Sequence, residues 1–201
     1  MTELRDPVFI IGGGPSAGKH KLERLYGKGT MIAVNDCFRY LPKSDIAFSG
    51  DGSWVNARRN ELRLFKGRVV VALPKKFKDP DIPGIEIIER KAGVGVSRQR
   101  NRVFFSANSG FAALSFAIAR KARQIALIGF DLDGAGWWHG GYDWIHKTGA
   151  ELYPGWASGF DSIAPKVQKL GVDVVNANKM SAIRAFRFVS FAKIVDGRAW
   201  K

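Results

Sequence analysis

Two carboxylates follow a buried strand near the middle of the chain, and their position suggests ligand chemistry. Residues 125–130, IALIGF, form a continuous apolar run, typical of a strand that is covered on both faces. Asp131 and Asp133 come directly after it, where the strand is expected to end. In an open parallel sheet, ligands bind at the carboxyl ends of the strands. We therefore predict that Asp131 and Asp133 line a ligand site and act in catalysis.

A turn of small residues opens the same unit. Ser109 and Gly110 precede an apolar helix predicted at 111–120, which leads into the strand. A turn of this kind, placed at the end of one strand and the start of a helix, directs backbone N–H groups at a ligand. The whole segment 108–134 is therefore interpreted as one functional unit.

The first predicted strand, residues 8–12, leads into a second candidate turn, GGGPSAGK. The G-x₄-G-K spacing of a phosphate-binding P-loop is met by Gly13, Gly18 and Lys19. However, His20 stands where that loop needs a hydroxyl for Mg²⁺, and Pro15 removes a backbone N–H. A second interpretation is a turn that lets a nucleotide approach closely, with Ser16 capping the helix. A purely structural tight turn fits the same residues.

Residues 134–159 are rich in glycine and aromatic residues and lack a periodic pattern. Long segments of this kind in compact domains are commonly lids or binding loops, and we expect a lid over the strand ends. Trp137 and Trp138 either stack on a sugar or base or anchor the loop. The candidates for proton transfer are Asp133, His139, Asp143 and His146, and a histidine is suited to deprotonating a hydroxyl acceptor.

Strands and helices alternate along the rest of the chain. Strands are predicted at 8–12, 30–34, 46–49, 68–72, 85–88 (at an edge), 124–129 and 173–175. Helices are predicted at 16–25, 53–64, 111–120, 161–170 and 182–195. This alternation favours a single α/β domain, 1–201, with a doubly wound, mostly parallel sheet.

Composition restricts the classes of protein further. With 201 residues and 46% hydrophobic residues, one domain can bury a sizeable core. Cys37 is the only cysteine, which excludes a disulfide within the chain and a thiolate metal cage. No signal-peptide pattern and no membrane-spanning run occurs in the sequence, so we expect a cytoplasmic protein.

The charge balance is strongly basic. The formal net charge is +14 and the isoelectric point is near 10.2, which favours polyanionic partners such as DNA or an anionic glycan acceptor. Arg98, Arg100 and Arg102 alternate ahead of the Ser109 turn. In an extended segment they share one face, and we expect that face to bind a polyanion near the mouth of the site. A solvated edge strand is the alternative.

Four sequence blocks occur in an order that resembles a known family. They are VFIIGGGPSAGK, IAVNDCFRYL, NSGFAALSFAIARKARQIALIGFDL and VDVVNANKMSAI. This set is similar to the small bacterial sialyltransferases and to the related domain of archaeal 6-hydroxymethylpterin diphosphokinases, short members of which are common in bacteriophage genomes. The resemblance implies a modified Rossmann fold with a nucleotide in a central cleft, in the host cytoplasm if the chain is phage-encoded.

The resemblance also assigns residues to this nucleotide site. It implies that the phosphate or ribose is lined by Gly12, Gly14, Pro15 and Ser16. Asn35 corresponds to an asparagine that contacts the nucleotide, and Ser109 and Gly110 to the turn that holds base and ribose. Asp131 corresponds to the acid after the following strand.

Two departures from the family pattern concern the chemistry. The sialyltransferase histidine base, five residues ahead of an aspartate, falls on Trp156 here, counting back from Asp161. Asp133 and His139 fall near the places of two leaving-group tyrosines. The diphosphokinases need Mg²⁺, for which Asp131 and Asp133, together with Asp51, are the candidate ligands.

Three functions remain open from the sequence. The first is a nucleotide-binding transferase that moves a glycosyl group from a nucleotide-activated donor. The second is a Mg²⁺-dependent phosphotransferase that resembles the pterin diphosphokinases. The third is a catalytically idle protein that binds nucleic acid or is associated with the virion. The first is our prediction.

Overall fold

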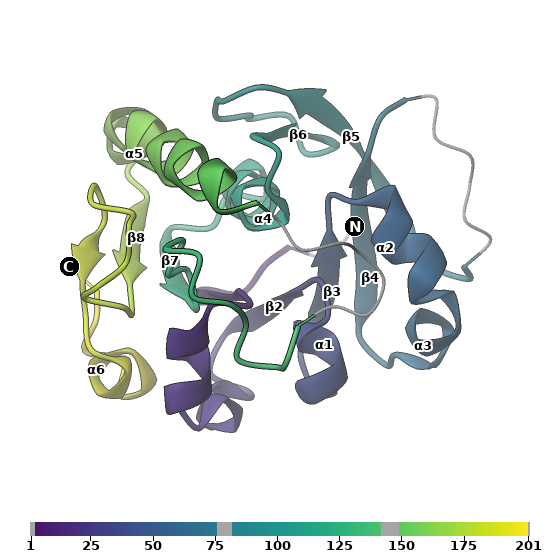
Figure 1. Cartoon of the computed structure of the whole chain (residues 1–201), viewed down its shortest axis with the longest axis horizontal. Helices are drawn as coiled ribbons and strands as arrows, with labels where there is room; N and C mark the ends of the chain where they lie inside the picture. The colour runs from purple at the N-terminus through teal and green to yellow at the C-terminus, as the bar shows by residue number, and fades with distance from the viewer. Residues whose placement is uncertain (1–2, 76–81, 142–148, 201) are drawn as a thin grey trace.

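A single nine-stranded sheet with helices on both faces forms the protein in a computed structural model (Figure 1). The structure describes residues 3–75, 82–141 and 149–200. Every pairing between neighbouring strands is parallel. The predicted α/β fold with a doubly wound sheet is therefore confirmed, and it is Rossmann-like. Within the described ranges, no helix has both the length and the apolar character that crossing a membrane requires.

The order of the strands contains one reversal. Across the sheet the order is β6-β5-β4-β3-β2-β1-β7-β8-β9. Their bounds are β1 Val8–Ile11, β2 Thr30–Val34, β3 Ile46–Ser49, β4 Arg68–Leu73, β5 Glu86–Ala92, β6 Arg102–Phe105, β7 Gln124–Ile128, β8 Asp173–Asn176 and β9 Arg187–Phe188. The chain builds the sheet outward from β1 in one direction and from β7 in the other. The boundary between β1 and β7 is thus a topological switch point, where doubly wound proteins bind ligands.

Both faces of the sheet are apolar and covered by helices. In β1, Val8 and Ile10 join one hydrophobic cluster with the helices α4 and α5, while Phe9 and Ile11 join a second cluster on the opposite face. The helices are α1 Cys37–Tyr40, α2 Gly52–Ala57, α3 Arg59–Leu64, α4 Ser109–Ala119, α5 Tyr153–Lys169 and α6 Phe191–Val195, with 3₁₀ helices η1 Pro15–Lys19, η2 Leu22–Leu25 and η3 Ala150–Leu152. Burial on both faces explains the continuous apolar runs of the strands.

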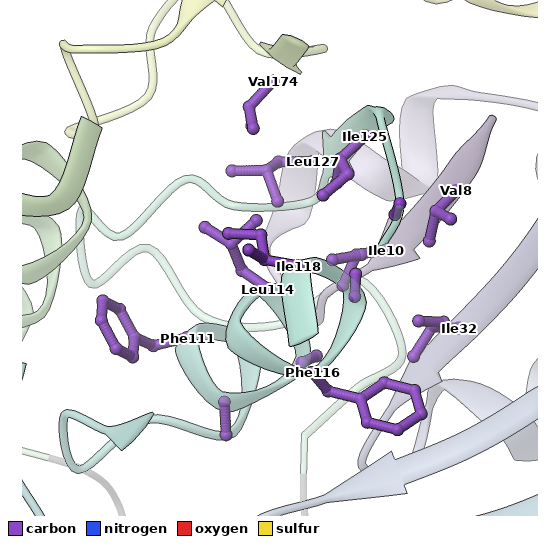
Figure 2. Packing of buried hydrophobic residues seen from close by; sticks show 14 of the residues in the cluster. Val8, Ile10, Ile32, Phe111, Leu114, Phe116, Ile118, Ile125, Leu127 and Val174 are labelled. Atoms are coloured by element: carbon purple, nitrogen blue, oxygen red, sulfur yellow. The ribbon is translucent and has the colours of Figure 1, made fainter. Parts of the chain in front are cut away.

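Helix α4 lies at the centre of the first layer. All 11 of its residues are buried. Figure 2 shows Leu114 and Phe116 of α4 projecting among side chains of the strands, whereas Phe111 points away from them. The Phe111 ring meets Phe160 of α5 edge to face, with 5.3 Å between the ring centroids. The helix follows β6 and returns the chain to the start of β7, so it runs antiparallel to the strands. Its amino end therefore lies at the carboxyl edge of the sheet.

Two of the predicted helices are wrong over most of their length. The segment 16–25 forms η1 and η2 instead of an α-helix, because the backbone is extended at His20, whose ring stacks on Phe191. Within 182–195 only α6 is helical, and β9 precedes it. The backbone N–H groups of Arg184 and Ala185 donate to Asp161, which holds that segment outside a helix.

Two other helix predictions need new boundaries. The helix predicted at 161–170 already begins at Tyr153, since Pro154 is well suited to the first turn of a helix. The residues 153–159 therefore belong to α5 and not to an irregular segment. The helix predicted at 53–64 is divided into α2 and α3 at Arg58, whose side chain is buried in an ion pair with Asp36.

Candidate functional site

A cavity of about 400 Å³ opens at the carboxyl edge of the sheet, beside the switch point between β1 and β7. Its walls come from the segments after β1, β2, β3, β6 and β7 and from the first turns of α5. The volume is typical of small-ligand sites, which measure roughly 300–1,000 Å³. The predicted site residues that line it are Gly12, Gly14, Asn35, Ser109, Gly110, Asp131 and Asp133. Pro15, Ser16 and His139 are described by the structure but lie outside the lining.

The Asp131 carboxylate joins the turns after β1, β7 and β8. Its Oδ1 accepts hydrogen bonds from the Ser16 backbone N–H at 3.1 Å and from Asn178 Nδ2 at 3.0 Å. Its Oδ2 accepts the Ser16 hydroxyl at 2.7 Å. Burial raises the pKa of Asp131, the hydrogen bonds from Ser16 lower it, and the charge of Asp133 raises it further, with a net upward shift. Asp131 is thus a fixed acceptor at the cavity wall.

The glycine-rich turn after β1 packs directly on the turn after β7. The N–H of Gly14 donates to the Gly129 carbonyl at 2.8 Å. A Cβ atom on Gly14 would overlap the Asp131 carboxylate, so this position requires glycine for the close approach of the two turns. The Ser16 N–H, which the sequence predicts to face a nucleotide, is bonded to Asp131 instead. The structural interpretation of this turn therefore accounts for Gly14 and Ser16.

Asn35 is held at the cavity by a short chain of hydrogen bonds. It follows β2 with φ 51°, a left-handed conformation that asparagine tolerates better than most residues. Its Oδ1 accepts the Ser49 hydroxyl at 2.7 Å, and Ser49 Oγ accepts the N–H of Asp51 at 3.0 Å. Asp51 in turn caps α2 by accepting the Ser53 N–H. Asn35 and Asp51 are therefore positioned together at the cavity wall.

The turn before α4 is fastened from the neighbouring strands. Ser109 Oγ accepts the Gly50 N–H at 3.1 Å, and Arg90 of β5 donates to the Gly50 carbonyl. The Arg90 guanidinium also lies over the Phe105 ring, 4.3 Å from its centroid. Because Ser109 Oγ uses an acceptor position for Gly50, its hydroxyl hydrogen can be donated to a ligand. Arg90 thus supports two parts of the cavity wall, Phe105 and Ser109.

A carboxylate and two rings form another part of the wall. Asp133 is exposed, and its Oδ1 accepts the Ala135 N–H at 3.0 Å in a tight turn. The rings of Tyr153 and Trp156, on the first turns of α5, are 5.1 Å apart and meet edge to face. Burial raises the pKa of Tyr153, and so does the charge of Asp133. Trp156, on which the family histidine falls, therefore presents an indole to the cavity.

The two adjacent tryptophans have different roles. Trp137 lines the cavity. Trp138 anchors the segment instead, because its Nε1 donates to the Gly12 carbonyl at 3.1 Å and its N–H to the Gly13 carbonyl at 3.0 Å. His139 is buried, stacked against Tyr40, and burial lowers its pKa. The geometry thus gives His139 a packing role and does not support its predicted place in catalysis.

The charged side chains that line the cavity are Asp51, Asp131 and Asp133, and within the described ranges none is basic. No group of three or more His, Cys, Asp or Glu side chains with metal-binding geometry occurs among the residues that the structure describes. Both oxygens of Asp131 already accept hydrogen bonds. The Mg²⁺ site predicted at Asp131 and Asp133 therefore has no preformed cage here and stays a prediction.

The basic segment 98–102 differs from its predicted geometry. Arg98 lies in a loop, Arg100 in a turn and only Arg102 in a strand, so the three arginines do not share one extended face. The Arg100 carbonyl accepts from Arg120, which follows the carboxyl end of α4. Arg100 thus lies near the carboxyl end of α4, whereas Arg102 opens the short strand β6, whose last residue, Phe105, lines the cavity. The prediction of one shared face is therefore wrong, and the place of the arginines near the cavity mouth stays a prediction. Arg102 pairs with Glu89.

Some predicted features fall outside the described residues. These are the proton-transfer candidates Asp143 and His146 and the middle of the predicted lid at 134–159. The described ends of that lid supply Gly134, Gly136 and Trp137 from one side and Gly149, Leu152, Tyr153 and Trp156 from the other to the cavity wall.

No family model, curated protein or solved structure matches the chain. The resemblance to sialyltransferases and pterin diphosphokinases therefore stays a prediction from sequence motifs, and the class of the protein is defined by its fold: a Rossmann-like, doubly wound α/β protein with a cavity at the switch point.

Sequence reasoning missed several residues of the site. Asn178 bonds Asp131, and Phe105 and Asn108 line the cavity. A signal for Asn178 is present, since it follows a predicted strand at the same sheet edge as the other site residues. Asn108 precedes the Ser-Gly turn and caps α4 through the Phe111 N–H, a pattern that an Asn before an apolar helix indicates. Phe105 belongs to β6, which the sequence predicted only as an extended segment.

Proposed function

We propose that the protein binds a nucleotide in the cavity beside β1 and β7 and transfers a glycosyl group from a nucleotide-activated sugar. The observation that supports this best is the convergence of three predicted nucleotide-contacting turns on one cavity. Gly12, Asn35 and Ser109 lie after three different strands and yet line the same space. The choice of glycosyl transfer, among reactions of nucleotides, rests on the sequence resemblance.

The amino end of α4 is the proposed anchor for the nucleotide. Ser109 and Gly110 form its first turn, and a helix amino end attracts anions through its dipole and unpaired N–H groups. The Ser109 hydroxyl adds a donor. Because Ser16 is already bonded to Asp131, the turn before α4 is a better candidate for holding phosphate or ribose than the glycine-rich turn after β1.

Asp133 is the proposed general base. It is exposed and lines the cavity, and carboxylates are among the side chains that accept a proton from a hydroxyl group in general base catalysis. In the proposed step, Asp133 takes the proton of an acceptor hydroxyl while the acceptor oxygen bonds to the anomeric carbon of the donor sugar. The bond from that carbon to the phosphate oxygen breaks, and the nucleotide leaves with the electron pair. Asp131, bonded on both oxygens, positions the turn beside this site.

A thermal-shift panel tests the proposed nucleotide site. CMP, UDP, GDP and ATP are each added with and without Mg²⁺, since a ligand at a hundredfold its Kd stabilises by about 2.7 kcal/mol. Ser109→Trp should fill the cavity and abolish the shift, whereas Ser162→Trp, on an exposed position of α5, should leave it unchanged. The absence of a shift with every nucleotide, or an unaltered shift in Ser109→Trp, contradicts the proposal.

A Mg²⁺-dependent phosphotransferase is the second candidate, and the carboxylate lining favours it. Asp51, Asp131 and Asp133 offer oxygen ligands of the kind that Mg²⁺ prefers, at a wall where no described side chain is basic. A metal ion would neutralise these charges and allow a triphosphate to enter. This candidate predicts stabilisation by ATP only when Mg²⁺ is present, and a weaker response to CMP, UDP and GDP.

A further inference from the structure

The charge inside the cavity is opposite to the charge of the whole chain. The chain carries a net charge of +14, yet the charged groups of the described lining are all carboxylates. Asp133 is exposed to the cavity, Asp51 is partly exposed, and Asp131 is held in place at the wall. Ionised carboxylates only accept hydrogen bonds, so groups with O–H or N–H donors are the favoured neighbours.

The same wall carries aromatic rings that can contact an apolar face. Trp137, Tyr153 and Trp156 are partly exposed and line the cavity, and Tyr153 and Trp156 meet at 66°. Aromatic rings provide large, rigid contact surfaces beside polar groups. A sugar ring matches this arrangement, because its C–H face can lie on a ring while its hydroxyl groups donate to the carboxylates.

We propose that the sugar bound in this cavity is uncharged or carries an amino group, and that acidic sugars are excluded. This inference rests on the proposed function and specifies its sugar class. The nucleotide phosphates are placed at the amino end of α4, whereas a sugar carboxylate would lie beside the exposed Asp133 with no cation among the described lining residues, and like charges at short range repel strongly where water is scarce. An ammonium group would instead be attracted to Asp133 and to the faces of the rings.

The inference is tested with three monosaccharides that have the same pyranose ring and differ in charge: glucose, glucosamine and glucuronate. Their Kd values are measured by ligand-observed NMR titration of the full chain, in low salt and with saturating nucleotide from the thermal-shift panel. We expect glucuronate to bind at least about tenfold more weakly than glucose, and glucosamine at least as tightly as glucose. Asp133→Asn should raise the affinity for glucuronate and lower that for glucosamine.

The control is Glu23→Gln, which removes one exposed carboxylate outside the cavity and should leave the three Kd values unchanged. Equal binding of the three sugars, preference for glucuronate, or an Asp133→Asn variant with unaltered ratios overturns the inference. Such results leave the nucleotide site intact, because the nucleotide shift is measured separately. If nucleotides bind and none of the sugars does, the inference is also overturned, whereas loss of the nucleotide shift contradicts the proposed function itself.

Discussion

The hydroxyl of Ser16 lies 2.7 Å from Oδ2 of Asp131, so the glycine-rich turn after β1 binds a carboxylate of the chain itself. The Ser16 N–H donates to the same group. An internal anion therefore occupies the place where a P-loop or a nucleotide turn would hold phosphate. The glycines serve the contact between β1 and β7, and the donors available to a ligand are expected at the turn before α4.

Replacing Ser16 by alanine should weaken this contact measurably. Ser16→Ala removes the hydroxyl donor to a buried carboxylate, and hydrogen bonds to charged groups contribute about 1.5–3 kcal/mol. We expect the free energy of unfolding, measured in urea at pH 7, to fall by about 1.5–3 kcal/mol. Ser44→Ala is the matched control, because Ser44 is also buried but donates to a neutral carbonyl. A loss no larger than that of the control contradicts the role of Ser16.

The same variant should change the pH dependence of stability. The pKa of Asp131 is raised above 3.8 in the folded protein. The folded protein therefore holds the proton of the Asp131 carboxyl group more tightly than the unfolded chain does. The resulting contribution to stability is full below about 3.8 and is lost as the pH rises through the raised pKa. Ser16→Ala removes an interaction that lowers the pKa of Asp131. In this variant the fall in stability with rising pH should therefore extend to a higher pH. Carboxyl ¹³C chemical shifts of Asp131 measure this directly.

Substitution of His139 should affect stability and not catalysis. His139 is buried beside Tyr40, and burial lowers its pKa below 6.5. The imidazole of His139 is therefore protonated more readily in the unfolded chain than in the folded protein. Stability should fall as the pH drops below 6.5 toward the lowered pKa. His139→Leu should remove this part of the pH dependence and leave nucleotide affinity unchanged. Loss of turnover in a folded His139→Leu variant would restore the predicted catalytic role.

Arg90 should support ligand binding without contacting the ligand. Arg90→Met retains an apolar chain beside Phe105 but removes the hydrogen bond to the Gly50 carbonyl, which in turn holds the Gly50 N–H against Ser109. We expect nucleotide affinity to fall by about tenfold, as one charge-assisted hydrogen bond would suggest. Lys91→Met, the next residue on the same strand, should have no such effect. Equal affinities in the two variants would show that Arg90 is not a positioning residue.

The fold was predictable because the strongest signals are local. Apolar runs at 8–12, 30–34 and 124–129 are long enough to indicate buried strands, and their alternation with helices indicates parallel pairing. The short outer strand β9 has only two residues, Arg187 and Phe188, with one of them exposed. Such a strand is defined by pairing with β8, which the sequence of the segment does not reveal.

The site was predictable as a place but not as a set of contacts. Residues at strand ends, such as Asn35 and Ser109, were found because parallel strands end at one edge. The bond between Ser16 and Asp131 joins residues 115 positions apart and depends on β1 lying beside β7. The different roles of Trp137 and His139 were equally hidden, since an irregular segment has no period that assigns its side chains to a face.

The basic segment should contribute to polyanion binding independently of the nucleotide site. The chain has 32 Lys and Arg against 18 Asp and Glu, more than a nucleotide requires. Arg98 is exposed, and Arg100 and Arg102 pair with Glu3 and Glu89. We expect binding to DNA or heparin that weakens steeply between low and physiological salt.

Changing these three arginines to serine should flatten the salt dependence. Each phosphate contact that is lost reduces the slope of log K against log salt by about 0.9 on duplex DNA, so the triple variant should lower it by about 1 to 3. The smaller value follows if the ion pairs with Glu3 and Glu89 persist in the complex. Nucleotide stabilisation in the thermal-shift panel should be unchanged, since none of the three arginines lines the cavity. A wild-type protein without salt-sensitive retention on DNA or heparin would end the polyanion hypothesis. An unchanged slope in the triple variant would show that other basic residues bind the polyanion.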